Sequence, residues 1–190
     1  MSRFFWVRHG PTHAKAMVGW TDLPADLSDQ AQLDRLHGHL PDNALVVSSD
    51  LTRAVTTADA IARDRTRLPH DPDLREINFG AWEMKSPKDV EDQQHLRAYW
   101  ETPGEVRAPE GESWNDVTAR VDAAVSRLLL SHPGRDIVAV AHFGVILTQV
   151  QTALNLSAYQ AFSHKIDNLS VTEIRLSDGQ WRAGAINHLP

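Results

Sequence analysis

The segment Arg-His-Gly at residues 8–10 combines side chains that could bind and attack an oxyanion. It follows the apolar run at residues 4–7, which is typical of a buried strand. The Arg8 guanidinium is a planar fork suited to phosphate or carboxylate, and Gly10 lets the backbone approach a ligand closely. A neutral His9 has a ring lone pair that can act as a nucleophile. The alternative is a strand end whose histidine only bonds to backbone groups.

Arg53 and His142 follow two further predicted strands. Arg53 lies near the start of a helix expected after Asp50, beside the positive end of that helix. His142 follows the apolar run at 136–141 and precedes another predicted helix. Taken singly, Arg53 is equally typical of a surface or salt-bridging residue, and His142 of a satisfied core or capping histidine. Their value as site residues therefore depends on whether the fold brings them together.

Hydrophobic periodicity predicts strands that alternate with helices, which favours an α/β fold with a mostly parallel sheet. The expected strands are 4–7, 44–47, 136–141, 170–176 and 180–186, and the expected helices are 28–40, 50–62, 87–100, 113–130 and 145–154. Ser28 and Asp50 are the expected caps of the first two helices. Ligands bind at the carboxyl ends of strands in such sheets. Arg8-His9, Ser48-Ser49 and His142 stand at three such ends.

Composition narrows the classes of protein. The 190 residues include 19 Lys plus Arg and 25 Asp plus Glu, a net charge of −6, which does not favour nucleic-acid binding. The absence of cysteine excludes disulfides, thiolate metal sites and cysteine nucleophiles. No apolar run reaches the roughly 18 residues that span a bilayer, and the first residues are too short an apolar stretch for a signal peptide. We expect a single domain over 1–190, without a membrane partner, in the cytoplasm.

Five motifs occur in an order that covers most of the chain: RHG at 8–10, SSDLTRA at 48–54, LREINFGAWE at 74–83, PEGES at 109–113 and AHFG at 141–144. Together they resemble the histidine phosphatase superfamily, which includes the cofactor-dependent phosphoglycerate mutases and many small phosphatases. The resemblance implies a three-layer αβα fold of the phosphoglycerate mutase type. It also implies catalysis without metal or other cofactor, because arginine and histidine supply the positive field.

The resemblance implies a role for each matched residue. His9 would be the nucleophile that forms a phosphohistidine, and Arg8, Arg53 and His142 would form the phosphate pocket. Glu76 would protonate the leaving oxygen and later deprotonate the attacking water, work that suits a carboxyl with a raised pKa. Glu83 is the rival carboxylate, although this second glutamate is usually structural in the family.

Four further residues are predicted to contact substrate. Thr12 could bond a phosphate oxygen, and the stretch containing Trp20 and Thr21 matches a loop that lines the family's pocket. Phe143 could donate its backbone N–H to phosphate, while its ring could narrow the pocket. The ordinary alternatives are a turn hydroxyl for Thr12 and simple packing for Trp20. Glu112 and Ser113 are interpreted mainly as residues of a helix start and a pocket wall.

Three positions depart from the commoner family pattern. Lys15 stands where asparagine is frequent, and Met84 and Phe143 stand where glycine is frequent. These changes bear on the size of the substrate and on the catalytic rate more than on membership of the superfamily.

Hydrolysis is favoured over a mutase reaction because a mutase must bind a second phosphate. The cap-like segment at about 84–108 is balanced in charge, with four basic residues (Lys85, Lys88, Arg97, Arg107) against four acidic ones (Glu91, Asp92, Glu101, Glu105). A phosphoglycerate mutase and a non-catalytic phospho-ligand-binding member remain the alternatives. The expected substrate is a small phosphomonoester, with sugar phosphates, the α-ribazole phosphate of cobamide synthesis and protein phosphohistidine as candidates. The expected oligomeric state is a monomer or a homodimer.

Overall fold

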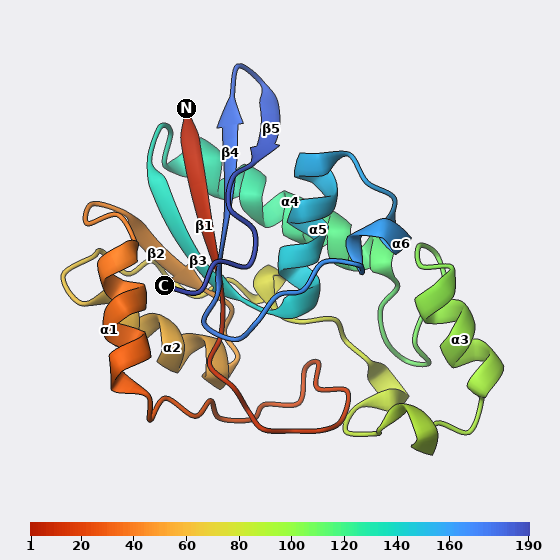
Figure 1. Ribbon diagram of the computed structural model, residues 1–190. Helices are drawn as coiled ribbons and strands as arrows, with labels where there is room; N and C mark the ends of the chain where they lie inside the picture. Colours follow the sequence, from red (N-terminus) through yellow and green to blue (C-terminus); the bar gives the residue numbers. More distant parts are fainter.

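Five strands form one sheet in the order β2-β3-β1-β4-β5 in the computed structural model, which describes residues 1–190 (Figure 1). Their bounds are Ser2–Arg8 (β1), Leu45–Ser48 (β2), Asp136–Ala141 (β3), Val171–Ser177 (β4) and Gln180–Ala183 (β5). β1, β2 and β3 run parallel, whereas β4 and β5 form an antiparallel hairpin at one edge. The predicted α/β fold with a mostly parallel sheet is confirmed.

Helices cover both faces of this sheet, which gives three layers (Figure 1). The α-helices are α1 (Gln30–His39), α2 (Thr52–Ala62), α3 (Gln93–Glu101), α4 (Trp114–Ser131), α5 (Phe143–Leu154) and α6 (Ala158–Ala161). Alternate side chains of β1 enter different cores, as the two-residue period of a strand requires. Phe4 and Trp6 pack with residues of α4 and α5, whereas Phe5 and Val7 pack with residues of α1 and α2.

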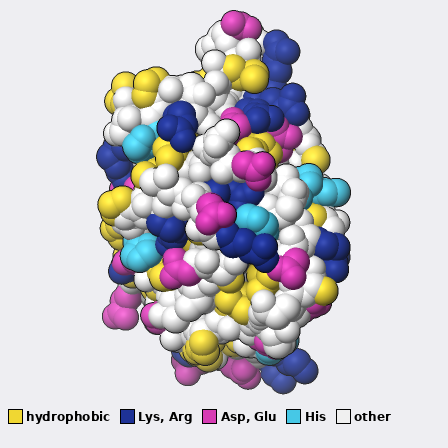
Figure 2. Space-filling model, turned by 90° about the vertical axis from the view of Figure 1, so that its left-hand side faces the viewer, with side chains coloured by type: hydrophobic (Ala, Val, Ile, Leu, Met, Phe, Trp, Pro, Cys, Tyr) yellow, Lys and Arg dark blue, Asp and Glu magenta, His cyan; other side chains and the backbone are white.

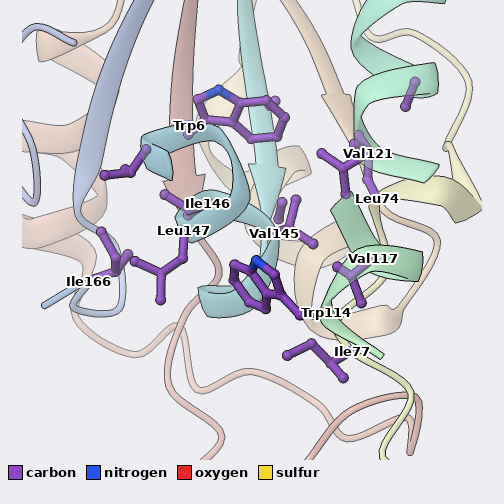
Figure 3. Close-up of a cluster of buried hydrophobic side chains, with 14 of the residues drawn as sticks. Trp6, Leu74, Ile77, Trp114, Val117, Val121, Val145, Ile146, Leu147 and Ile166 are labelled. Carbon is purple, nitrogen blue, oxygen red and sulfur yellow. The ribbon is translucent and has the colours of Figure 1, made fainter. Parts of the chain in front are cut away.

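The larger core lies between the sheet, α4 and α5 and is drawn in Figure 3. Trp6, Trp114 and Ile146 are central members of it. Leu74 and Ile77 reach it from an irregular segment, and both side chains are almost completely buried. Burying a side chain of this size is worth about 1.5–3 kcal/mol relative to leaving it exposed. These two anchors therefore fix the backbone of residues 75 and 76 between them.

Two helix starts differ from the prediction, that of α2 because long-range contacts replace a local cap and that of α1 by a one-residue shift of its cap. Asp50 does not cap α2; its carboxylate pairs with Arg75, with Nε to Oδ1 at 2.6 Å. Asp22 takes the capping role from a distant loop and accepts from both the backbone N–H and the hydroxyl of Thr52, at 2.8 and 2.7 Å. α1 begins at Gln30, with Asp29 rather than Ser28 as its cap.

The other two shifted helices are α3, which lies within the predicted cap-like segment at 84–108, and α5, which follows the second histidine. α3 is shorter than predicted, because a separate 3-10 turn occupies Pro87–Asp89 and Asp92 caps α3 through the N–H of His95. α5 starts at Phe143, two residues earlier than predicted, with His142 at its cap position.

The segment at 84–108 carries α3 and lies beside the sheet rather than on it (Figure 1). Tyr99 of α3 packs edge-on against Trp82 of the 3-10 turn Gly80–Trp82, with the ring centroids 5.3 Å apart. Two backbone hydrogen bonds tie the start of the segment to the N-terminal loop, from Met17 to Lys85 at 2.9 Å and from Met84 to Met17 at 2.8 Å. The segment is therefore joined to the loop that follows Arg-His-Gly.

The face drawn in Figure 2 presents acidic, basic and histidine side chains close together. Among the helices, none is long and apolar enough to cross a membrane.

Met84 has a positive φ of 61°, in the left-handed region that favours glycine. A left-handed conformation costs an ordinary residue about 1–2 kcal/mol, whereas glycine loses roughly 0.5–1 kcal/mol more chain entropy on folding. The Met84 side chain is about half exposed, so its removal costs little packing. We expect Met84→Gly to raise the free energy of unfolding by about 0.5 kcal/mol, measured by urea denaturation. Lys85→Gly, next to it, should lower that free energy; an equal loss in both variants would contradict this account.

Candidate active site

The carboxyl ends of the three parallel strands bring the predicted chemical residues to one edge of the sheet, at the lower end in Figure 1. The strand hydrogen bonding continues one residue past β1 and β2, with His9 and Ser49 donating to the carbonyls of Ala141 and Val140, each at 3.1 Å. The rings of His9 and His142 lie with their centroids 5.0 Å apart. The parallel register thus sets both histidines side by side.

His9 is held as a neutral ring with a defined tautomer. Its Nδ1 lies 2.6 Å from the carbonyl oxygen of Gly10, and because a carbonyl can only accept, Nδ1 carries the proton. Nε2 therefore keeps its lone pair and accepts a hydrogen bond from Arg53 Nε at 3.3 Å. Burial, with the positive charge of Arg53, lowers the pKa of His9 to about 3. His9 is thus a free base at neutral pH.

Two arginines flank this histidine, the buried Arg53 and the half-buried Arg8. Arg53 lies on the first turn of α2 and donates to the carbonyls of Thr21 and Gly19, at 3.0 and 2.6 Å. Arg8 donates to the carbonyl of Ile166 at 2.7 Å, and its Nε is buried without a partner. A guanidinium has five N–H donors, so both groups retain donors that a bound oxyanion could use.

His142 is completely buried behind His9. Its Nε2 lies 2.6 Å from the hydroxyl of Ser49, and its Nδ1 has no partner. Burial, followed by the field of His9, holds the pKa of His142 well below its ordinary value. Burial therefore favours a neutral ring over the additional positive charge that a protonated His142 would supply.

Glu76 is a buried carboxyl at the start of α5. It accepts hydrogen bonds from the backbone N–H of Gly144, at 3.0 and 3.2 Å, and from that of Ile77, at 2.9 Å. Burial raises its pKa, because desolvation outweighs the opposing effect of these N–H groups and of Arg53 and Arg8. A Cβ at position 144 would lie 2.5 Å from Oε1, so this close approach requires the glycine of the AHFG motif.

Glu83 occupies a different environment. Its carboxylate accepts from the backbone N–H groups of Gly19, Trp20, Thr21 and Phe79, and from the Thr21 hydroxyl at 2.7 Å. These contacts fold the loop after Arg-His-Gly onto the segment of the acidic motif. A carboxylate this fully bonded suits a structural role, so Glu76 is the better candidate acid.

A pocket of about 210 Å³ opens among these groups. Six of its lining residues were predicted as site residues: Arg8, His9, Thr12, Arg53, Glu76 and Phe143. The other five carry no chemically reactive group, so their sequence pattern did not mark them: Ala14, Ala16, Met17, Val18 and Phe79. The pocket therefore combines a charged floor with an apolar wall.

Three residues predicted to bind substrate do not line this pocket. His142 lies behind His9, as described. Trp20 turns its ring to the Arg75 guanidinium, 4.8 Å away, and its Nε1 donates to the carbonyl of Glu76 at 2.8 Å. The hydroxyl of Thr21 is taken by Glu83 and its carbonyl by Arg53. Trp20 and Thr21 thus support the backbone of Glu76 and the side chain of Arg53 from outside.

Arg120 on α4 is a positioning residue that the sequence did not reveal. Its guanidinium donates to the carbonyls of Asp73, Arg75 and Glu76 at 2.7–2.9 Å. Glu112 holds it through two hydrogen bonds of 2.7 and 2.9 Å and also accepts from the N–H of Asn78. Glu112 of the PEGES motif therefore supports the backbone of Glu76, the candidate acid, through Arg120.

We expect Arg120→Met to lower kcat by about 10²-fold with little change in KM, because the backbone of Glu76 loses its anchor and small misplacements of a reacting group are costly. Arg120→Lys should restore part of the rate. Arg127→Met is the matched control, since Arg127 also lies on α4 but bonds only to the side chains of Asp71 and Asp73. Equal losses in the Arg120→Met and Arg127→Met variants, measured by steady-state kinetics, would remove the special role of Arg120.

A neutral buried histidine, two arginines and a buried carboxyl at the strand ends of an α/β sheet define a site suited to phosphoryl transfer through a histidine. The chain belongs to the histidine phosphatase superfamily (branch 1), whose family model matches residues 4–188. The resemblance inferred from the motifs is thereby confirmed, and the protein is an enzyme of the phosphatase and mutase type.

Individual relatives cover nearly the whole chain. A protein of Escherichia fergusonii named "Probable phosphoglycerate mutase GpmB" is 26% identical over 205 residues, which cover 100% of this chain and 95% of the relative. Bacillus stearothermophilus YhfR superposes with a TM-score of 0.91 at 25% identity, covering 100% of this chain and 98% of that one. The mycobacterial glucosyl-3-phosphoglycerate phosphatase Rv2419c superposes with a TM-score of 0.80 at 29% identity, covering 97% of this chain and 98% of that one. The alpha-ribazole phosphatase of Shigella flexneri superposes with a TM-score of 0.82 at 25% identity, covering 98% of this chain and 96% of that one.

Proposed function

We propose that this protein is a metal-independent phosphomonoester hydrolase that acts on a small phosphorylated metabolite through a phosphohistidine intermediate. The observation that carries the proposal is the state of His9: its Nδ1 is committed to the Gly10 carbonyl, and its unprotonated Nε2 faces the pocket between Arg8 and Arg53. Covalent catalysis of this kind divides one difficult displacement into two easier ones.

The proposed reaction has two half-reactions. In the first, His9 Nε2 bonds to phosphorus while the ester P–O bond breaks, and Glu76 gives its proton to the departing oxygen. Arg8 and Arg53 offset the charge on the equatorial phosphoryl oxygens. In the second, Glu76 takes a proton from water, the resulting hydroxyl bonds to phosphorus, and the P–N bond breaks. Inorganic phosphate leaves, and both His9 and Glu76 regain their starting protonation states.

A phosphoglycerate mutase is the second candidate, because several relatives of the chain carry that name. A mutase must bind a second anionic group of the substrate and return the phosphoryl group to it. Beyond the phosphate-binding groups, however, the pocket wall consists of apolar side chains with no further basic residue. This wall supports hydrolysis over mutase activity.

The test is hydrolysis of p-nitrophenyl phosphate in EDTA, beside conversion of 3-phosphoglycerate to 2-phosphoglycerate. We expect EDTA-resistant release of phosphate and no isomerisation. The screen of natural phosphomonoesters should begin with α-ribazole phosphate, because a structural neighbour is a phosphatase named for it. Isomerisation without hydrolysis would establish the mutase, and phosphate binding without any turnover would establish a non-catalytic member.

A further inference from the structure

We propose that the pocket selects phosphomonoesters whose leaving group is uncharged and largely apolar, and discriminates against those with a second anionic group. This inference rests on the proposed function and concerns the leaving-group side of the same site. It follows from how the charged and apolar residues divide the pocket between them.

All the ionisable side chains that line the pocket belong to the phosphate-binding end. They are Arg8, His9, Arg53 and Glu76. The loop after Arg-His-Gly supplies the small and apolar wall through Ala14, Ala16, Met17 and Val18, and aromatic rings supply the rest through Phe79 and Phe143. A leaving group directed away from Arg8 and Arg53 therefore meets hydrocarbon.

Two basic groups just outside the pocket, Arg75 and His13, are already paired. Arg75 forms a bidentate ion pair with Asp50 and lies over the ring of Trp20. His13 bonds to Asp26 at 2.7 Å. Lys15 is exposed and does not line the pocket. A second carboxylate or phosphate held against the apolar wall would thus lose water without gaining Arg75 or His13 as a partner, which is unfavourable.

The part of the apolar wall at residues 17–19 is fixed by backbone contacts. Met17 exchanges two backbone hydrogen bonds with residues 84 and 85. Gly19, two residues later, is packed so closely that a Cβ there would lie 2.0 Å from the carbonyl of Ile77. The wall between these ties includes Val18, so bringing a distant cation into it would require breaking them.

A matched pair of substrates tests the inference: phenyl phosphate and 3-carboxyphenyl phosphate, which differ by one negative charge. We expect kcat/KM to be at least about tenfold lower for the carboxylate, which corresponds to about 1.4 kcal/mol. Val18→Arg should bring the two values together by adding a positive partner to the wall. Leu130→Arg is the control, because Leu130 is exposed on α4 and does not line the pocket; it should leave the ratio unchanged.

Binding of phenylphosphonate and 3-carboxyphenylphosphonate by calorimetry repeats the comparison without any turnover. Equal affinities and equal kcat/KM values for the two members would overturn the inference and leave the proposed hydrolysis intact. Preferential binding of phenylphosphonate with no hydrolysis of either ester would keep the selectivity and overturn the proposed function. An unchanged ratio in Val18→Arg would show that the wall does not set the discrimination.

Discussion

His9→Ala will abolish EDTA-resistant hydrolysis of p-nitrophenyl phosphate, with a loss in kcat of about 10⁴-fold or more, as expected when a covalent nucleophile is removed. The variant keeps Arg8 and Arg53 and should still bind inorganic phosphate. It lacks the unprotonated ring nitrogen, Nε2, that lies beside Arg53 in the pocket. A loss in turnover without a loss in phosphate binding would separate a nucleophile from a mere binding group.

The intermediate itself gives the second readout for His9. Wild-type protein quenched in alkaline detergent during turnover should carry phosphate on a histidine, and His9→Ala should carry none. His39→Ala is the matched control, because His39 lies at the end of α1 with its ring 4.6 Å from that of His188 and does not line the pocket. Full activity in the His9→Ala variant, or phosphohistidine at another position, would contradict the proposed mechanism.

Much of the fold was accessible from the sequence because its elements are strongly periodic. The run 136–141 was predicted as a strand with the bounds that β3 has, and Ser113 begins α4 through a capping box with Asp116. The misplaced start of α2 is decided by tertiary contacts. Asp50 has the right type and position for a cap of α2, but the ion pair with Arg75 takes its carboxylate, and Asp22 caps the helix from 30 residues away.

The candidate site was likewise predictable only in part. The juxtaposition of Arg8, His9 and His142 was predictable, since parallel strands end at one edge of a sheet. The role of Arg120 was not, because its partners are backbone carbonyls, which every residue has. The apolar wall at residues 14–18 was also hidden, because short apolar side chains in a loop give no periodic signal. The wall and the anchor of the acid are therefore properties of the fold.

Glu76→Gln is predicted to remove the alkaline limb of the pH profile. The raised pKa of Glu76 keeps the carboxyl protonated to higher pH than an ordinary glutamate. In the wild type, kcat/KM for phenyl phosphate should therefore fall as pH rises through that pKa and the proton donor is lost. Glutamine has no such proton to lose, so the variant should show a lower, flatter profile. We expect the loss at the pH optimum to be about 10²–10⁴-fold, the usual contribution of general acid–base catalysis.

The quality of the leaving group distinguishes an acid from a structural carboxyl. p-Nitrophenolate departs without protonation, so Glu76→Gln should form the phosphoenzyme from p-nitrophenyl phosphate at a rate closer to that of the wild type. The second half-reaction would still lack its base, and a burst of one p-nitrophenol per active site should precede slow turnover. Glu83→Gln should slow both substrates alike and retain the alkaline limb, because Glu83 holds the loop at residues 19–21 and the backbone of Phe79. If Glu83→Gln instead lost the limb and Glu76→Gln kept it, the acid would be Glu83 and its five hydrogen bonds would have to rearrange on substrate binding.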